Sequence, residues 1–371
     1  MATLPPSSTI YSSAQRNAVI IQVVSSLVSF NALLVLFGLM IFMKKTYTHT
    51  HFQAYFVCLL LANTMQAWAN IISLGWVTRG GVQDGGLCAM QGGLKQGGNV
   101  GSAVWSFVIS LHLFNLLFLR YKTPKLISWG MVVFGWSFVF TIVFIGPVAI
   151  ETAARGPFFG IAEHSCWITL NYRVQQIFME YFFEYLSVVL SFLLHVGTFL
   201  RVRGNLLCVD GRWRVRWVPF GDSWQLSLGR DFTDSAMLAL AKHMVWYPVA
   251  YAVTIIPVSI TRIAQFCGLD VPLWLDTLTN CIFDLGGLAN VVLFFGARHF
   301  FPKASALPAF TEQRKDTARD AIVAQHGVTP FTLQRPASEM SEVSLGLPPV
   351  SPRRRTSMMS INSLTPMRHD F

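Results

Sequence analysis

Seven long apolar runs, separated by short polar gaps, dominate the sequence. Most of them are apolar all round, whereas a helix at the surface of a soluble domain keeps one polar face. Each run reaches the ~20 residues that a helix needs to cross the ~30 Å hydrocarbon core of a bilayer. We predict an all-α membrane protein, a seven-transmembrane helix bundle with spans at 18–43, 54–78, 94–120, 126–150, 174–200, 244–267 and 272–297.

The third run organises the others. It follows Cys88, carries Lys95, and ends at Arg120 after an uninterrupted apolar stretch. As one helix, the stretch from Cys88 to Arg120 would be roughly 48 Å long. One element can therefore contribute to a pocket on one side of the membrane and to partner contacts on the other.

Composition supports the membrane assignment, because only 12% of residues are charged against about 25% in soluble domains. The first run is longer than the apolar core of a cleavable signal peptide, so we expect a retained signal anchor. Basic residues then set the orientation: 22 of the 28 Lys and Arg fall in 44–53, 120–125, 201–243 and 298–371. This bias predicts an extracellular N-terminus and a cytoplasmic C-terminus.

The orientation divides the chain into four regions. They are an extracellular N-terminus (1–17), a transmembrane domain (18–300), a long basic third cytoplasmic loop within it (201–243), and a largely disordered cytoplasmic tail (301–371) rich in Ser and Pro. The net charge of +10 is then a topology signal and does not indicate nucleic acid binding. We expect a multi-pass protein of the plasma membrane.

The third cytoplasmic loop contains a hairpin signal, Asp210-Gly211, between Leu206-Leu207-Cys208-Val209 and an alternating Arg, Trp and Val stretch. Such a hairpin would carry one basic and one aromatic face, suited to anionic lipid or to a partner protein. A solvated loop whose arginines only obey topology is an equal alternative.

Ionisable groups near the outer ends of the spans are candidates for ligand binding, because charges inside a membrane are costly and face cavities or partners. Lys95 and Arg262 would receive an anionic or hydroxyl-rich ligand, while the acids orient these two cations. Purely structural salt bridges are the equal alternative. The candidate set is Lys95, Gln91, Asn99, Glu180, Glu184, Arg262 and Asp276.

A polar face also runs through the middle of the membrane. Asp284 lies near the centre of the hydrocarbon core, where a buried acid is a candidate switch or ion site. We expect Asn290 and Asn70 to belong to the same intramembrane switch. Pro248 and Pro257 interrupt the sixth span, which is therefore a candidate moving lever.

Two cysteines, Cys88 and Cys166, fall in the same predicted extracellular layer, where a disulfide would shape the mouth of a cavity. Two free thiols remain the alternative. In the tail, Thr356 and Ser357 follow Arg353-Arg354-Arg355, a pattern that basophilic kinases favour, although it has low specificity. HExxH, GxSxG, Walker and paired CxxC motifs are missing from the sequence, and the seventh span has no lysine for a retinal Schiff base. We expect neither an enzyme nor a metal or cofactor.

Several short patterns occur together: Gly86-Leu87-Cys88 with Gln91-Gly92, Cys166-Trp167-Ile168, Arg203-Gly204-Asn205, Tyr247 and Tyr251 with Pro257 and Arg262, and Gly287-x-x-Asn290. Through this set, residues 15–300 resemble the cyclic-AMP-receptor-like G-protein-coupled receptors, particularly fungal relatives that include presumed nutrient or glucose sensors. The resemblance implies a seven-helix receptor that acts as exchange factor for a heterotrimeric G protein, with a Cys88–Cys166 disulfide. The third span ends Phe118-Leu119-Arg120-Tyr121, without the acid that precedes this arginine in rhodopsin-like receptors, so an ionic latch is not expected there.

We therefore expect a G-protein-coupled receptor for a small polar ligand such as a nutrient, sugar or nucleotide-like molecule, which feeds cyclic AMP signalling. Membrane lipid and a second copy of the chain are compatible partners. A transporter or channel for a small polar solute is the alternative, and an orphan seven-helix scaffold is a third. The expected G-protein contacts are Arg120, Tyr121, Arg203, Arg214, Arg216 and Lys242.

Overall fold

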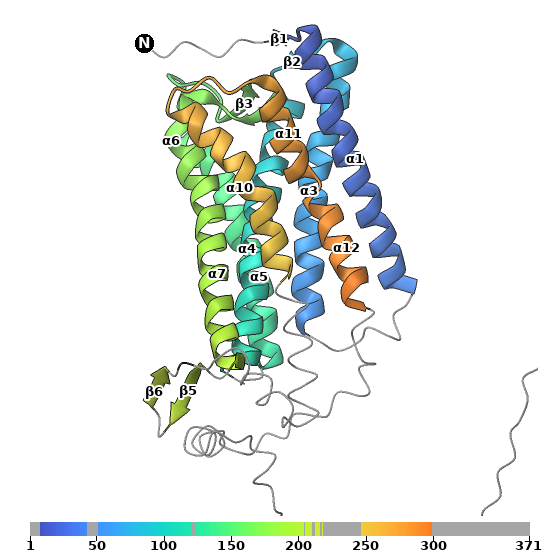
Figure 1. Cartoon of the computed structure of the whole chain (residues 1–371). Coiled ribbons are helices and arrows are strands. Elements are labelled where there is room, and N and C mark those ends of the chain that lie inside the picture. The colour runs from blue at the N-terminus through green and yellow to red at the C-terminus, as the bar shows by residue number, and fades with distance from the viewer. Residues whose placement is uncertain are drawn as a thin grey trace, which may run out of the picture.

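The computed structural model describes residues 8–42, 51–119, 123–203, 205–209, 212–215, 217 and 246–298. Within these residues, seven helical segments are long and apolar enough to cross a membrane. Figure 1 shows them side by side in one bundle. The helices are α1 (Ser13–Phe42), α3 (His51–Arg79), α4 (Gly86–Leu117), α5 (Lys125–Ile145), α7 (Phe182–Arg203), α10 (Trp246–Phe266), and the consecutive pair α11 (Leu273–Asp284) and α12 (Gly286–Arg298). The predicted seven-helix bundle is confirmed.

Large apolar side chains cover the outside of this bundle. On α5, Val133 and Phe134 are 65% and 73% exposed, and on α7 Phe192 is 67% exposed. A soluble protein rarely leaves apolar patches of this extent in water. The outer surface is therefore built to face lipid, and the chain is a multi-pass membrane protein.

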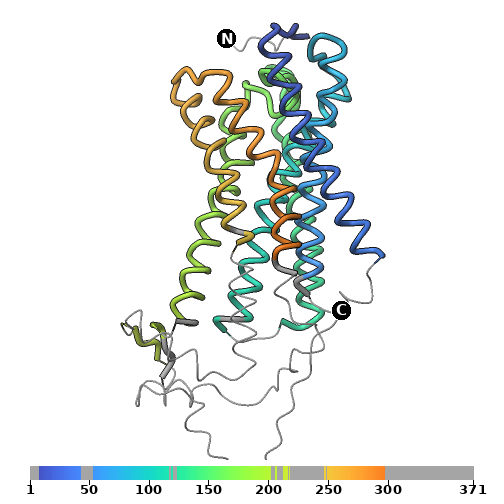
Figure 2. Tube along the Cα trace, turned by 45° about the vertical axis from the view of Figure 1, so that its right-hand side comes forward, coloured from blue at the N-terminus to red at the C-terminus, as the bar shows by residue number. Residues whose placement is uncertain are grey.

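Helix α4 lies inside the bundle and packs against α3, α5, α7 and α10, and Figure 2 shows the bundle from a second side. Its glycines let α3 approach closely: a Cβ added at Gly98 would lie 2.6 Å from the backbone nitrogen of Gln66. Trp105, fully buried on α4, lies in a core cluster shared by α1, α3, α4, α10 and α12. This helix holds the bundle together.

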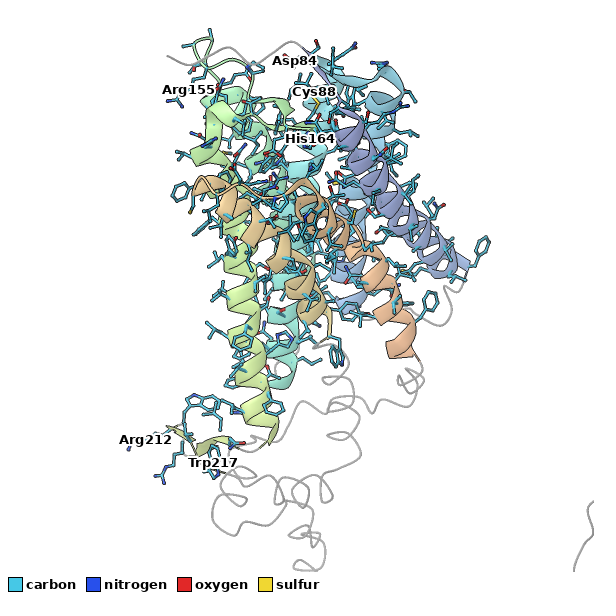
Figure 3. All side chains as sticks on the ribbon, turned by 45° about the horizontal axis from the view of Figure 1, so that its top comes forward. Asp84, Cys88, Arg155, His164, Arg212 and Trp217 are labelled. Atoms are coloured by element: carbon cyan, nitrogen blue, oxygen red, sulfur yellow. A yellow bond between two sulfur atoms is a disulfide. The ribbon has the colours of Figure 1, made fainter. Side chains whose placement is uncertain are left out.

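One end of the bundle carries small sheets and a disulfide, and we call it the disulfide end. Strand β1 (Ser8–Ile10) pairs with β2 (Gly81–Gln83), and β3 (Phe159–Ala162) pairs with β4 (Ser165–Ile168) in a tight hairpin. The Cys88–Cys166 disulfide, with Cα atoms 5.2 Å apart, joins α4 to β4. It lies in a small core cluster with Trp76, Val82 and Ile161. Figure 3 labels Cys88 and His164 at this end, and Arg212 and Trp217 at the opposite one.

The disulfide is confirmed, and the alternative of two free thiols is excluded. The hairpin that it anchors lies across α4 at the disulfide end, because both β3 and β4 pack against that helix. The hairpin therefore forms a cover over this end of the bundle.

Three of the seven spans contain irregular turns. In the fourth span, the π-helical turn η1 (Gly146–Ile150) follows α5. Between the short helix α6 (Arg173–Gln176) and α7, the π-helical turn η3 (Ile177–Tyr181) carries Glu180, and such turns are frequent at functional sites. The seventh span is broken at Leu285, directly after Asp284. In the sixth span, Pro257 lies inside α10, where it removes one hydrogen bond of the helix.

The hairpin predicted at Asp210-Gly211 is present: β5 (Leu206–Val209) pairs with β6 (Arg212–Val215). Its Trp213 stacks on Phe118, the residue that follows α4, with ring centroids 5.1 Å apart. The guanidinium of Arg201 lies 5.0 Å from the Trp213 ring and 5.4 Å from the Phe118 ring. These contacts fix the hairpin to the ends of α4 and α7.

Several expected contact and modification positions lie outside the described residues: Arg120, Tyr121, Arg216, Lys242, Thr356 and Ser357. The side chain of Arg203 lies outside them too, whereas Arg214 is described on β6 and is exposed. The expected tail and most of the third loop therefore remain predictions.

Candidate functional site

A pocket of about 140 Å³ opens at the disulfide end, between the β3–β4 hairpin, α6 and α10. This is far above the ~10–15 Å³ that one water requires. Its wall combines three cations, one acid, one hydroxyl, two amides and an aromatic and apolar floor: Lys95, Arg173, Arg262, Glu163, Ser165, Gln176, Gln265, Ala162, Trp167, Leu170 and Phe266. The lining is thus rich in positive charge and hydrogen-bond donors.

Arg262 is the most constrained cation of the pocket. It forms an ion pair with Glu163 at 3.1 Å and lies 3.9 Å from Asp276 on α11. It also donates a hydrogen bond of 2.9 Å to Gln265. The structural ion pairs considered as the alternative are therefore present at Arg262.

Lys95 differs from Arg262, because its one described polar contact is a long one, 3.5 Å from Nζ to the hydroxyl of Ser165. It lies on α4 beneath the β3–β4 hairpin and lines the pocket. Of the candidate ligand-binding set, Lys95 and Arg262 share this pocket. The two cations are brought together from different helices, α4 and α10.

Glu163 occupies the first position of the two-residue β3–β4 turn, with a φ of 58°. Positive φ is uncommon outside glycine, and a residue held there typically costs about 1–3 kcal/mol. The register, with Ala162 opposite Ser165, and the ion pair to Arg262 hold it in place. Glu163 is not among the site residues expected from the sequence, although a polar Glu163-His164 pair between two apolar strands is a turn signal.

Glu180 lies behind the pocket wall and not on its surface. Its carboxylate accepts hydrogen bonds from Asn99 at 2.6 Å and from the indole of Trp167 at 2.7 Å. Trp167 therefore separates Glu180 from the pocket. Glu184, one turn further on, is 1% exposed, and its Oε2 has no hydrogen-bond partner among the described residues.

Gln91 is placed between α3 and α4. Its amide donates to the carbonyl of Ala69 and the hydroxyl of Ser73, and its oxygen accepts from the indole of Trp76 at 2.7 Å. With these groups satisfied and its side chain fully buried, Gln91 ties helices together and does not line the pocket.

Asp284 forms the polar centre of the bundle. Asn70 of α3 donates to its Oδ1 at 2.6 Å, and Ser25 of α1 lies 3.5 Å from its Oδ2. The acid therefore links three helices at the point where the seventh span is broken. Asn290 lies elsewhere, in the wall of a 10 Å³ cavity with Asn63, Gln66 and Ser102, which has room for about one water.

No group of three His, Cys, Asp or Glu side chains suited to a metal ion occurs in the described part of the chain. The chemistry that the pocket at the disulfide end offers is thus charge recognition: ammonium and guanidinium groups, a hydroxyl and amides around a small space. Such a wall can bind and orient a small anion or a polyhydroxyl compound.

Comparison with solved structures identifies the fold of this chain. No family model matches the chain, and no curated protein matches it. Among solved structures, the chain is similar to squid rhodopsin, with a TM-score of 0.54 and 12% sequence identity over 86% of this chain and 97% of that one. At this level of identity the likeness defines the fold, and the chain is a multi-pass membrane protein with the seven-helix fold of rhodopsin.

Proposed function

We propose that this protein is a G-protein-coupled receptor that binds a small polar ligand in the pocket at the disulfide end. The observation that carries the proposal is the convergence of Lys95 and Arg262 on one cavity of about 140 Å³ in a rhodopsin-like bundle. Buried or partly buried charges around a cavity are characteristic of binding sites. In this proposal the disulfide end faces the cell exterior, where a disulfide is stable.

Signalling would follow from a ligand that prefers one of two bundle arrangements. Movement of α10 at Pro257 and of the broken seventh span at Asp284 would then open a cleft at the opposite end. We assign the G-protein surface to that end, with the exposed Arg214 of β6 and Arg203, Arg120, Tyr121, Arg216 and Lys242. The narrower assignment, a cyclic-AMP-receptor-like receptor of fungal type in the plasma membrane that feeds cyclic AMP signalling, rests on the sequence resemblance.

The experiment that tests the proposal is nucleotide exchange on heterotrimeric G proteins reconstituted with the full chain in proteoliposomes. We expect exchange above the level of G protein alone, and a further rise with one member of a panel of sugars, amino acids, organic acids and nucleotides. Flat exchange with every G protein of the host would contradict the proposal. Uptake of a labelled solute by the same proteoliposomes would then identify a transporter.

Lys95→Ala tests the pocket itself. Loss of a charge-assisted hydrogen bond is worth about 1.5–3 kcal/mol, so we expect the ligand concentration for half-maximal exchange to rise roughly 10–100-fold. Arg155→Ala is the matched control, because Arg155 is an exposed cation at the same end that does not line the pocket. If the ligand concentration for half-maximal exchange is the same in Lys95→Ala and in the unmodified chain, Lys95 does not belong to the binding site.

A further inference from the structure

The pocket at the disulfide end contains its own carboxylate. Glu163 lies 3.1 Å from Arg262, and its side chain is 36% exposed. The second acid beside Arg262, Asp276, is buried on α11 and lies farther away, at 3.9 Å. The two acids therefore differ: Asp276 belongs to the packed helices, whereas Glu163 reaches Arg262 from a surface turn.

The position of Glu163 makes its contact displaceable. It lies at the tip of the β3–β4 hairpin, where the paired strands end at Ala162 and Ser165. Its positive φ of 58° is a conformation that side-chain-bearing residues rarely adopt. A rotation of the exposed Glu163 side chain would withdraw the carboxylate without disturbing the helices.

The remaining wall favours a second anion. Arg262 presents a planar guanidinium, which binds carboxylate and phosphate through paired N–H groups. Lys95 and Arg173 line the same pocket, and the Lys95 ammonium has only the 3.5 Å contact to Ser165 among its described polar neighbours. An anion in the pocket would meet three cations and compete with a single exposed acid.

We propose that Glu163 is an internal competitor for the ligand: a carboxylate or phosphate group entering the pocket takes the place of the Glu163 carboxylate on Arg262. This inference rests on the proposed function and deepens it, because it assigns the ligand an anionic group. It also makes Glu163 a determinant of specificity, since a neutral ligand gains nothing when this acid is removed.

Thermal unfolding of the full chain in detergent tests the competition without a G protein. Inorganic phosphate and succinate are titrated against sodium chloride of equal ionic strength, with glucose as the neutral probe. We expect one of the two anions to raise the unfolding temperature, and the better one distinguishes a phosphate from a carboxylate site. In Glu163→Gln the half-saturating concentration of that anion should fall about fivefold, as expected for removal of a partly exposed ion pair.

Asp270→Asn is the matched control, because Asp270 is an exposed acid in the connection between α10 and α11. The half-saturating concentration of the anion for Asp270→Asn should equal that for the unmodified chain. Glucose should have the same effect on the unfolding temperature of all three proteins. If Glu163→Gln does not fold, Glu163→Asn serves instead, since asparagine tolerates positive φ.

Equal half-saturating concentrations in Glu163→Gln and the unmodified chain would overturn the inference. An equal fall in Asp270→Asn, or no response to either anion, would do the same. The proposed function fails separately. If Glu163→Gln tightens anion binding but nucleotide exchange is flat, the receptor function is contradicted and the competition by Glu163 stands. If a neutral sugar drives exchange and its effect is unchanged in Glu163→Gln, the receptor function stands and the competition is contradicted.

Discussion

At the scale of single residues, Tyr11 fastens the N-terminal segment to the pocket cover. Its hydroxyl donates to the carbonyl of His164, in the β3–β4 turn, at 2.7 Å, and its ring packs beside Trp76 and the disulfide. Burial raises the pKa of Tyr11 from its ordinary 10.0 to about 12, because the phenolate loses hydration. Tyr11 thus remains a neutral donor over the whole physiological range.

This shift of the pKa predicts that the stability of the N-terminal segment falls at alkaline pH. The folded pKa of Tyr11 lies above the unfolded value, so its contribution to stability is complete below pH 10 and is lost as the pH rises towards about 12. Hydrogen exchange of the amides of residues 8–12 should accelerate across that window beyond the intrinsic pH effect. In Tyr11→Phe the additional acceleration should be absent. The same acceleration in both proteins would assign it to other groups.

Asp284 gives a second prediction at this scale. Its two oxygens accept from Asn70 and Ser25, and an amide has only one acceptor oxygen, so Asp284→Asn loses one of the two hydrogen bonds that the acid accepts. If Asp284 is a switch, basal nucleotide exchange should rise severalfold, about what loss of one hydrogen bond of ~1 kcal/mol allows, while the protein remains folded. Asn70→Ala removes the shorter link from the other side and should act in the same direction. Wild-type exchange in both variants would reduce Asp284 to packing.

At the scale of elements, the contact between α3 and α4 depends on missing side chains. A Cβ at Gly98 would meet the backbone of Gln66 at 2.6 and 2.9 Å, and backbone atoms cannot rotate away. Polar side chains add to the same contact, because Gln91 bonds across it to Ala69 and Ser73. The two helices therefore form a close and rigid pair that positions Lys95.

Gly98→Ala should consequently destabilise the protein. Overpacking of this kind costs about 1–3 kcal/mol, so the unfolding temperature in detergent should fall by several degrees. Gly75→Ala on α3 is the control, because a Cβ there would have nothing within 4 Å and alanine is the better helix former. A fall of the same size in both variants would exclude the close approach as the cause.

At the scale of the whole molecule, the apolar outer surface fits a bilayer, and polar as well as apolar side chains are buried inside the bundle. The charge distribution along the sequence predicts how the bundle is oriented in the bilayer. The arginine and lysine bias predicts that the disulfide end faces outward. The Cys88–Cys166 bond agrees, because disulfides persist in oxidising compartments.

A native cysteine allows this orientation to be measured. Cys267 is free and exposed directly after α10, at the disulfide end, whereas Cys58 is buried. A membrane-impermeant thiol reagent should therefore label intact cells at Cys267, and Cys267→Ser should abolish that labelling. Labelling only after permeabilisation would place the disulfide end in the cytoplasm and would reverse the proposed topology.

The hydrophobic pattern by itself determined the seven helices, because a membrane requires long apolar helices whose backbone hydrogen bonds are satisfied internally. Local chemistry also determined the β5–β6 hairpin at Asp210-Gly211. The sequence placed Cys88 and Cys166 in one expected extracellular layer, and the family resemblance implied their disulfide, which the structure contains.

Only the tertiary structure decided how the polar residues are shared between packing and the pocket. Helical spacing placed Gln91, Glu180 and Lys95 at a similar depth, yet Gln91 is used between α3 and α4 and Glu180 is covered by Trp167. Glu163 entered the pocket through the fold of a hairpin far from Arg262 in sequence. The physical reason is that depth in the membrane follows from position along one helix, whereas the direction a side chain faces depends on the helices and loops packed around it.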